Sequence, residues 1–320
     1  MSLRNSIARL RIIVVGDVML DEYWFGDVQR ISPEAPVPIV RVNRSEERPG
    51  GAANVARNIV ALGASATLLS VVGADDASAR LRVVLDEAGI DHRLQTDPSI
   101  RTTVKLRVIG HQQQMLRIDF EDMPSREVLD QKRSDFANVL DDADLVVFSD
   151  YRKGALEHVD DLIAQVRARG KPILVDPKGD DFSRYAGATA LTPNRSEFAA
   201  VAGKWKSPEE FEASAEAFRK QLNVEALLIT MSEQGMMLFR EGSMLHKPAQ
   251  AREVFDVSGA GDTVIAALAI MVAVGATWEH AVDFANAAAG LVVSKLGTSV
   301  VSFDEIAPLL ADLESWTFSA

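Results

Sequence analysis

DVSGAGDT, residues 256–263, leads directly into the longest apolar run of the chain, residues 264–276. The run is apolar on nearly all sides, which is typical of a fully buried helix, and Gly275 predicts where that helix ends. The first N–H groups of a helix have no partner within it, and the positive end of the helix dipole lies there. Because Gly259, Ala260 and Gly261 have little or no side chain, an anion can approach those N–H groups closely. The stretch therefore predicts an anion site at the start of a buried helix.

Asp262 lies at the edge of this predicted anion site. A carboxylate beside a bound anion is useful as a general base, but an acid in the first turn of a helix also caps it and complements its dipole. Both interpretations stay open from this stretch alone. Two better-known phosphate motifs are excluded, because GAGDTV lacks the third glycine of the dinucleotide-binding fingerprint and no segment fits G-x-x-x-x-G-K-[ST].

Composition narrows the classes of function. The 320 residues carry a formal net charge of -12, which argues against a nucleic-acid or anionic-membrane partner, because either would require a basic surface. The absence of cysteine from the sequence excludes disulfides, thiolate metal sites and thiol nucleophiles. The five histidines show no metal-ligand spacing, residues 12–15 are too short an apolar run for a signal peptide, and residues 264–276 are short for a membrane span. We expect a soluble, cytoplasmic protein.

Short apolar strands alternate with helices along most of the chain, which predicts an α/β fold with a mainly parallel sheet covered by helices on both faces. Strands are predicted at residues 11–16, 66–72, 144–148, 172–175 and 226–230, the last with a hairpin partner at 236–239, and helices at about 77–88, 159–169, from near 196, after 262 and at 279–296. No internal repeat or long linker interrupts the sequence, so we expect one domain over residues 1–320.

Polar residues follow several of the predicted strands. The carboxyl ends of parallel strands meet at one edge of a sheet, which is where open α/β sheets bind ligands. The residues concerned are Asp17, Asp150, Lys153, Asp176, Lys178, Asn194, Glu197 and Thr230. Each of them alone could be an ordinary loop residue, but together they outline one active edge beside the anion site.

Two segments, at about 23–48 and 101–120, do not fit the parallel sheet, because their apolar residues alternate with polar ones or are interrupted by proline. We expect them to form a small β-strand lid over the carboxyl edge of the sheet. The alternation places Lys105, Arg107 and Arg117 on one side of the lid. In so acidic a protein they could bind an anionic substituent of a ligand, or they could form an ordinary solvated strand face. Exposed lid strands also invite pairing with a second copy, so we expect a homodimer through the lid.

A double glycine opens a second predicted helix. In PGGAAN, residues 49–54, Gly50 and Gly51 precede an apolar periodicity that ends at Gly63. The pair could let backbone N–H groups meet a ligand, or it could simply form a tight turn, which is the more common reason for such a pair. Asn54 in the first turn could hydrogen-bond to ligand hydroxyls.

Three stretches resemble signatures of the ribokinase-like (PfkB-type) sugar kinases. Residues 256–262 are similar to the carboxy-terminal pattern D-T-x-G-A-G-D, with Val257 in place of threonine, and residues 49–56 resemble the amino-terminal double-glycine pattern. NRSE, residues 194–197, is similar to the family's N-x-x-E motif. The three occur in the family's order and span most of the chain, so the chain is identified as a member of that family. The resemblance implies the ribokinase-like fold, with ATP and Mg²⁺ as cofactors.

Within the family, three further segments resemble the heptose 7-phosphate kinases of lipopolysaccharide-core biosynthesis. These are VGDVMLD at 15–21, ISPEAPVP at 31–38 and SDYRKG at 149–154. The resemblance implies phosphorylation of D-glycero-D-manno-heptose 7-phosphate at its anomeric (C1) hydroxyl, giving the 1,7-bisphosphate for ADP-heptose biosynthesis. Such kinases are often fused to a nucleotidyltransferase, and since the sequence ends soon after Phe303 we expect the stand-alone kinase.

The resemblance also implies residue roles. Asp262 would accept the proton of the sugar hydroxyl, and the N–H groups of Gly259, Ala260 and Gly261 would stabilise the transferring phosphoryl group. The sugar hydroxyls would bind Asp17, Gly50, Gly51, Asn54 and Asp150, and the distal phosphate would bind Lys105, Arg107, Arg117 and Lys153. Mg²⁺ would bind Asn194 and Glu197 through water. The nucleotide would bind Asn194, Glu197, Thr230, Ser232, Gly235, Gly261 and Asn286. A monovalent-cation site is a further implication, which Val257 weakens.

Two alternatives are left open by the sequence. One is a ribokinase-like kinase acting on a fructose phosphate or a nucleoside, although a nucleoside kinase would have little use for a cluster of cations on the lid. The other is a non-catalytic nucleotide-binding module. Asp262 together with Gly259 and Gly261 speaks against such a module, and an assay of ATP turnover distinguishes the two.

Overall fold

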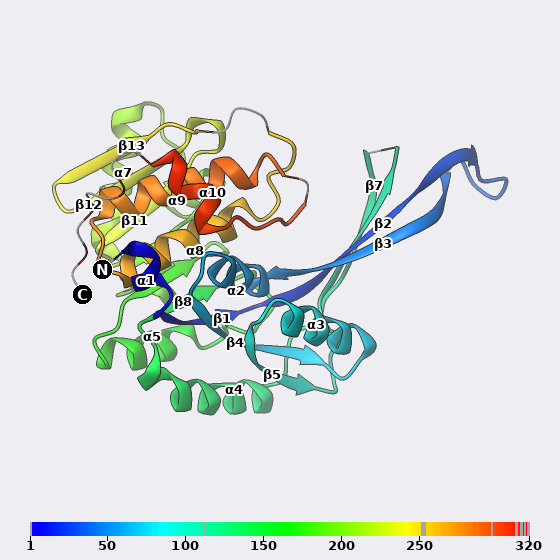
Figure 1. Ribbon diagram of the computed structural model, residues 1–320, viewed down its shortest axis with the longest axis horizontal. Coiled ribbons are helices and arrows are strands. Elements are labelled where there is room, and N and C mark those ends of the chain that lie inside the picture. The colour runs from blue at the N-terminus through cyan, green and yellow to red at the C-terminus, as the bar shows by residue number, and fades with distance from the viewer. Residues whose placement is uncertain are drawn as a thin grey trace.

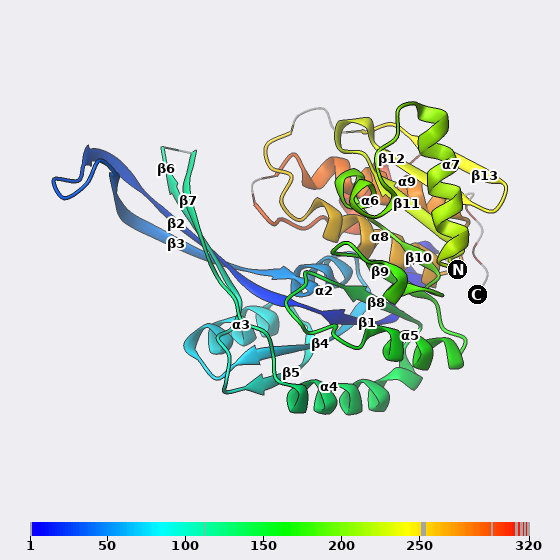
Figure 2. The same cartoon turned by 180° about the vertical axis from the view of Figure 1, so that it is seen from behind.

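Two β-sheets organise the chain in the computed structural model, which describes residues 2–111, 113–250, 254–295, 297–310, 313, 316 and 318. Within these residues, a nine-stranded sheet forms the centre of the body and a four-stranded sheet forms an arm that projects from it (Figures 1 and 2). None of the described helices combines the length and apolar character needed to cross a membrane.

The large sheet is mostly parallel. Its strand order is β13-β12-β11-β10-β9-β8-β1-β4-β5, and only β12 and β13 add antiparallel pairs, at one edge. The strands are β1 (Arg11–Gly16), β4 (Ser65–Gly73), β5 (Asp91–Asp97), β8 (Leu145–Ser149), β9 (Ile173–Asp176), β10 (Ala190–Leu191), β11 (Ala226–Thr230), β12 (Met236–Arg240) and β13 (Ser243–Lys247). The predicted mainly parallel α/β sheet is therefore confirmed.

Helices cover both faces of this sheet because its strands are apolar on both sides. The helices are α1 (Leu3–Ile7), α2 (Ala52–Ala61), α3 (Asp76–Glu87), α4 (Arg126–Val139), α5 (Val159–Ala168), α6 (Arg195–Ala202), α7 (Pro208–Gln221), α8 (Ala260–Ala273), α9 (Trp278–Val292) and α10 (Phe303–Ile306), with 3₁₀ turns at Leu140–Asp142, Ser183–Tyr185, Ser232–Gln234 and Ala307–Leu309. One core contains α1, α2, α3, α8, α9 and α10, and the other contains α4 to α7.

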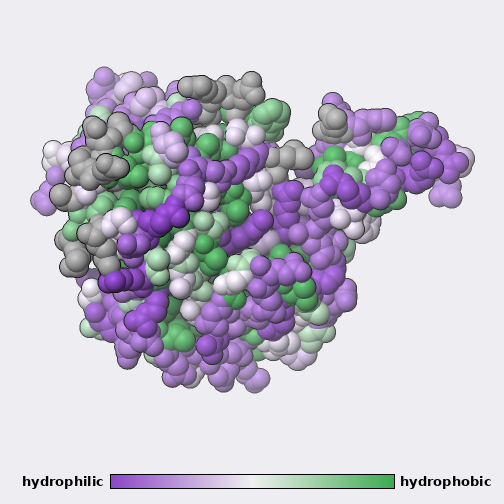
Figure 3. All heavy atoms as spheres, viewed as in Figure 1, coloured by the Kyte–Doolittle hydropathy of each residue, from purple (hydrophilic) through white to green (hydrophobic). Residues whose placement is uncertain are grey.

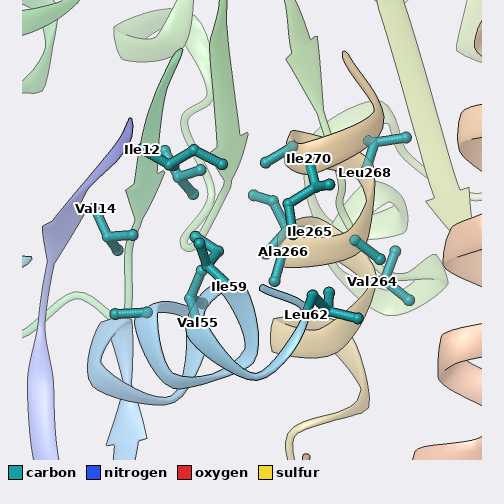
Figure 4. Packing of buried hydrophobic residues seen from close by; sticks show 14 of the residues in the cluster. Ile12, Val14, Val55, Ile59, Leu62, Val264, Ile265, Ala266, Leu268 and Ile270 are labelled. Carbon is teal, nitrogen blue, oxygen red and sulfur yellow. The ribbon is translucent and has the colours of Figure 1, made fainter. Parts of the chain in front are cut away.

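Helices α2 and α8 pack against one another over strand β1. Figure 4 shows Ile59 of α2 and Leu62, the residue that caps its C-terminus, pointing toward Ile265 of α8, with Ile12 of β1 beside them. All four side chains are at most 1% exposed. Since full burial of such a side chain is worth roughly 1.5–3 kcal/mol, this contact holds the end of α2 against the first turns of α8. The two glycine-containing stretches of the sequence are thereby brought together.

The small sheet is the lid, with strand order β3-β2-β6-β7. Its strands are β2 (Val18–Ile31), β3 (Pro38–Gly51), β6 (Val104–Gly110) and β7 (Gln113–Phe120). Strand β2 begins only two residues after β1 ends, so the lid starts at the carboxyl edge of the large sheet (Figure 1). The prediction of a lid from the two segments is confirmed, but β2 and β3 are longer than predicted, because apolar residues at 18–20 pair with 49–51 where the lid joins the body.

Several elements carry too little apolar signal to have been predicted. These are β5, α4, α7 and β13, whose sequences are largely polar and bury few side chains. The predicted helix 279–296 is shorter in the structure, since α9 ends at Val292; Leu296 lies outside the described residues.

Candidate active site

Asp262 is a buried carboxylate in the first turn of α8, and it is 3% exposed. Gly259 precedes the helix in the left-handed conformation, with a φ of 77° that favours glycine, and turns the chain into α8. Asn54 Nδ2 donates to Oδ2 of Asp262 at 2.7 Å, and the Tyr151 hydroxyl donates to Oδ1 at 2.6 Å. Two neutral donors from distant parts of the chain therefore hold the two oxygens of one acid.

The surroundings of Asp262 suit it to proton transfer near neutral pH. Burial raises the pKa of Asp262 to about 6, against the hydrogen bonds from Tyr151 and Asn54, which lower it; the charge of Asp21 raises it further. A capping acid needs no such burial, and at pH 7 this carboxyl is mostly ionised and still basic. The environment favours the general-base interpretation of Asp262.

The N-terminus of α8 presents part of the predicted anion site. A Cβ added at Gly261 would meet no heavy atom within 4 Å among the described residues, so this position is open to a ligand. The N–H of Ala260, by contrast, already donates to the carbonyl oxygen of Val257 at 3.2 Å. Of the three predicted donors, Gly259 and Gly261 are the ones that fit an incoming anion.

Asp17 is turned away from Asp262 and into the loop that follows β8. Its carboxylate accepts from the backbone N–H groups of Tyr151 at 2.8 Å, Lys153 at 3.0 Å and Ala155 at 2.8 Å. Burial raises the pKa of Asp17, as does the charge of Asp150, while these three N–H groups lower it. Asp17 thus fixes the loop 150–155, and its predicted role as a sugar ligand stays a prediction.

Asp21, rather than Asp17, faces the lid side of the site. Its Oδ1 accepts from Arg107 at 2.6 Å, and its charge reaches both Asp262 and Tyr151. A Cβ at Gly50 would lie 2.4 Å from Oδ2 of Asp21, so only glycine leaves room for this carboxylate. The double glycine therefore serves close approach between β3 and β2 at the base of the lid.

A pocket of about 190 Å³ lies beside Asp262 at the carboxyl edge of the large sheet. It is lined by Asp150, Tyr151, Asp176, Pro177, Lys178, Thr192, Asn194, Glu197, Thr230, Gly259, Gly261 and Asp262. Six of the eight polar residues that follow the predicted strands are among these residues, so the structure brings them together, and their role as an active edge stays a prediction. Burial raises the pKa of Asp176 well above its ordinary value, and the charges of Asp262 and Glu197 raise it further.

Asn194 and Glu197 form the N-terminal capping box of α6. The Asn194 side chain accepts from the N–H of Glu197 at 2.9 Å, and Glu197 Oε2 accepts from the N–H of Asn194 at 2.9 Å. Glu197 Oε1 pairs with Lys178 Nζ at 2.7 Å. Among the described residues, no group of three acidic or histidine side chains is placed to hold a metal ion directly. These side chains therefore suit a Mg²⁺ ion that keeps its water ligands, rather than an ion coordinated directly by several protein groups.

A second pocket, of about 350 Å³, lies on the other side of the α8 N-terminus. Thr230 and Gly261 line both pockets, so the two adjoin. All the residues predicted for the nucleotide, apart from Asn194 and Glu197, line this second pocket: Thr230, Ser232, Gly235, Gly261 and Asn286. Its walls are mostly apolar, with Met236, Val257, Val264 and Val293, as a flat aromatic ring requires.

The third pocket, of about 790 Å³, lies between the lid and the body and is named the lid pocket below. It is lined by Tyr23, Phe25, Gly26, Asn43, Arg44, Arg48, Arg107, Ile109, His111 and Gln114 of the lid and by Phe255, Asp256, Ser258 and Gly297 of the body. The guanidinium carbons of Arg48 and Arg107 each lie 5.1 Å from the centroid of the Tyr23 ring. A Cβ at Gly297 would lie 2.1 Å from Nη1 of Arg48, so glycine there admits the arginine.

The four cations predicted for a distal phosphate are distributed unequally. Arg107 lies opposite Arg117 in the β6–β7 ladder, so Lys105, Arg107 and Arg117 do share one lid face, as predicted. Only Arg107 lines the lid pocket. Arg117 is half exposed and pairs with Asp119 at 2.9 Å. Lys153 does not line this pocket, and its Nζ pairs with Glu121 at a distance of 2.5 Å.

Comparison with known proteins agrees with this geometry. Residues 9–305 match the family model described as pfkB family carbohydrate kinase. The chain belongs to the pfkB family of carbohydrate kinases. It is therefore an enzyme that phosphorylates a sugar with ATP, and a non-catalytic binding module is not the correct interpretation.

Individual relatives and a solved structure give further detail. The chain is 54% identical over 303 residues to a protein named D-beta-D-heptose 7-phosphate kinase from Bordetella bronchiseptica, covering 95% of this chain and 97% of that one. It is 52% identical over 298 residues to a bifunctional protein HldE from Methylococcus capsulatus, covering 93% of this chain but only 63% of that one. An Arabidopsis thaliana ribokinase solved with ribose and ATP superposes with a TM-score of 0.75 at 21% identity, covering 94% of this chain and 98% of that one, which confirms the ribokinase-like fold.

Sequence reasoning missed several contacts of this site. It gave no role to Tyr151, although that residue lies within the segment 149–154, and it did not include Asp21 among the site residues. Arg48, next to the double glycine, was also missed. Asp21 of β2 lies directly opposite Arg48 of β3. This pairing would have indicated both residues, but it can be recognised only once the register of the two strands is known.

Proposed function

We propose that this enzyme transfers the γ-phosphoryl group of ATP to the anomeric hydroxyl of D-glycero-D-manno-heptose 7-phosphate, giving the 1,7-bisphosphate for lipopolysaccharide-core biosynthesis. The observation that carries the proposal is the position of Asp262, a buried base where a mostly apolar pocket adjoins a polar one. The arginine-lined lid pocket reaches Ser258, next to Gly259. The relative from Bordetella supports the choice of sugar. We take residues 1–320 as one kinase domain, with lid segments at about 23–48 and 101–120, that works in the cytoplasm.

Asp262 is the general base of the proposed reaction. Its ionised carboxylate accepts the proton of the anomeric hydroxyl as the oxygen attacks the γ-phosphorus, and ADP leaves on the opposite side. Positioned proton transfer of this kind contributes about 10²–10⁴-fold to rate. The N–H groups of Gly259 and Gly261, aided by the positive end of the α8 dipole, stabilise the charge on the transferring group, an effect worth about 10²–10³-fold for one donor.

Nucleotide and metal are proposed to meet at the α8 N-terminus. Thr230, Ser232, Gly235 and Asn286 line the site for the base and ribose of ATP, whose phosphates then reach Gly261. Asn194 and Glu197 would hold Mg²⁺ through water, which suits their engagement in the capping box. When bound, the ion neutralises charge on the phosphates. A requirement for a monovalent cation is tested by replacing potassium with tetramethylammonium in the assay.

The sugar is proposed to lie beneath the lid. The residues proposed for its hydroxyls are Gly50, Gly51, Asn54, Asp17, Asp21 and Asp150, of which Asp150 lines the pocket beside Asp262. The terminal phosphate would point to the lid pocket. Arg107 and Arg48 are the cations that best fit this phosphate, because guanidinium groups bind phosphate through paired N–H donors. Lys105, Arg117 and Lys153 add positive charge nearby.

We propose a homodimer that forms through the lid. The evidence is the face of the small sheet opposite the one that carries Arg107. There Trp24, Leu116, Ile118 and Phe120 are 39%, 54%, 37% and 37% exposed, although all are large and apolar. They alternate with the residues of the Arg107 face, so they point away from the lid pocket. Figure 3 shows the arm projecting from the body with hydrophobic residues visible on its surface. A patch of this kind is typical of a protein interface.

The experiment that tests the function is ADP release from MgATP across a panel of sugars, each with and without a terminal phosphate. We expect turnover with heptose 7-phosphate and little with heptose itself. Turnover only with fructose phosphates would keep the mechanism and replace the sugar. A preference for nucleosides would contradict the assignment of the lid pocket to phosphate.

A further inference from the structure

Tyr151 contacts Asp262, but the proposed mechanism gives it no role. Its hydroxyl donates to Oδ1 of Asp262 at 2.6 Å, while Asn54 holds Oδ2 at 2.7 Å. With a donor on each oxygen, the plane of the carboxylate is fixed, and its remaining lone pairs point in defined directions. A base that must meet one hydroxyl of a sugar benefits from this preorganisation, because misplacement of a reacting group lowers the rate steeply.

The loop that carries Tyr151 is anchored from below by Asp17. This carboxylate, 2% exposed, accepts three backbone N–H groups of the loop, including that of Tyr151 itself. Lys132 of α4 is buried under the same loop, and its Nζ donates to the carbonyl oxygen of Ala155. Asp17 does not touch Asp262, so any effect on the base passes through the position of Tyr151.

The charges around Tyr151 keep its hydroxyl protonated. Burial raises the pKa of Tyr151 well above its ordinary value of 10, and the carboxylates of Asp262, Asp176 and Asp21 raise it further. The pKa of Asp176 is in turn raised by the charge of Glu197 and lowered by that of Lys178. The hydroxyl is therefore a hydrogen-bond donor at every pH at which the enzyme works, and it cannot replace Asp262 as the base.

We propose that Tyr151 is a positioning residue for phosphoryl transfer, whose hydroxyl orients the Asp262 carboxylate toward the acceptor hydroxyl, and that Asp17 acts through it by fixing the loop. The inference rests on the proposed role of Asp262 as the base. It assigns to Asp17 a contribution to turnover that is separate from sugar binding.

The test compares Tyr151→Phe with Tyr185→Phe. The first keeps the ring and removes the donor to Asp262. The second is a matched control, because the Tyr185 hydroxyl makes an equally short bond, 2.6 Å, to the buried Asp150 and no contact with Asp262. For Tyr151→Phe we expect kcat to fall about 10–100-fold, the cost of a lost hydrogen bond to a charged group, with the KM values for both substrates little changed.

The pH dependence separates positioning from simple loss of structure. Because the Tyr151 hydrogen bond lowers the pKa of Asp262, its removal moves the acidic limb of kcat to higher pH, whereas Tyr185→Phe leaves the limb in place. The same shift is measured without substrate by ¹³C NMR titration of labelled aspartate, with the Asp262 signal assigned from Asp262→Asn. Wild-type kcat and an unmoved Asp262 titration in Tyr151→Phe would overturn the proposal, as would equal shifts in both tyrosine variants.

Asp17→Asn tests the second half of the proposal. The amide is close in shape but a weaker acceptor, so we expect a lower kcat and an acidic limb displaced in the same direction as in Tyr151→Phe. The double variant should be no slower than Tyr151→Phe alone, since Asp17 acts through the tyrosine; fully additive losses would exclude this. Inactivity of the wild-type enzyme toward heptose 7-phosphate would overturn the proposed substrate, while the NMR titration still decides the role of Tyr151.

Discussion

The carboxyl edge of the large sheet and the lid hold their charged groups in opposite ways. At the sheet edge, Asp262 and Asp17 are buried and held by neutral donors, namely hydroxyl, amide and backbone N–H groups. On the lid, Arg117 and Lys105 both pair with the carboxylate of Asp119, on a face that is partly open to solvent. Burial of this kind shifts the pKa of a carboxyl group and suits it to proton transfer, whereas ion pairs open to solvent are screened and contribute little stability.

This difference separates chemistry from recognition. Substitutions at the sheet edge should change kcat and its pH dependence, and substitutions on the lid should change KM, its salt dependence and self-association. Arg107 and Asp21 form the connection between the two regions, because their ion pair of 2.6 Å lies at the junction and is mostly buried. The predictions below test where the boundary lies.

The largest effect is expected for Asp262→Asn. Without the base, kcat should fall about 10²–10⁴-fold, while calorimetry should still detect binding of ATP and of the sugar phosphate. Retention of turnover near the wild-type level would show that the buried acid is a structural cap.

A smaller effect is expected for Arg107→Gln, compared with Arg117→Gln. Loss of a charged donor to the terminal phosphate should raise the KM for the sugar phosphate about 10–100-fold and flatten its dependence on salt. Arg117→Gln, on the same lid face but outside the lid pocket, should change KM by less than about threefold. Equal effects of the two substitutions would move the phosphate out of the lid pocket. Thermal unfolding of Arg107→Gln controls for loss of the ion pair with the buried carboxylate of Asp21.

The pH profile gives a graded effect on the wild-type enzyme. The pKa of Asp262 is raised from 3.8 to about 6, so the carboxyl takes up a proton as the pH falls through 6. Since only the ionised form accepts the sugar proton, kcat should fall about tenfold for each pH unit below 6 and be level above it. An acidic limb near pH 4 would mean that Asp262 is solvated in the working enzyme.

The smallest effect on catalysis is expected at the outer face of the lid. Leu116→Asp introduces a charge among Trp24, Ile118 and Phe120, so sedimentation equilibrium should show a monomer where the wild-type protein is a dimer. The KM for ATP should stay unchanged, because the pocket proposed for the nucleotide is in the body. A wild-type monomer, or a dimer that survives the substitution, would contradict the lid interface.

The sequence predicted those parts of the molecule that depend on local pattern. Helix α8 follows from its uninterrupted apolar run, and it is found as expected. The residues that the resemblance implies for the nucleotide line one pocket, and their role stays a prediction. Helix α7 was not predicted, because only Phe211, Ala215 and Arg219 of its 14 residues are buried and its sequence is largely polar.

Contacts between distant segments could not be predicted in the same way. Asn54 was expected to bind sugar hydroxyls, but its amide holds Asp262, 208 residues away. Asp17 was expected to face the ligand, yet a strand end can turn its last side chain in either direction, and here the N–H groups of the following loop decide it. Such choices depend on packing and register, which a single sequence does not contain.

The most direct test of the proposed function is ³¹P NMR of the product formed from heptose 7-phosphate and MgATP. We predict that the signal of the original phosphate persists and that a second phosphate appears on the sugar, coupled to the anomeric proton, in step with ADP. A new phosphate on any other carbon, or ADP without a phosphorylated sugar, would contradict transfer to the anomeric hydroxyl.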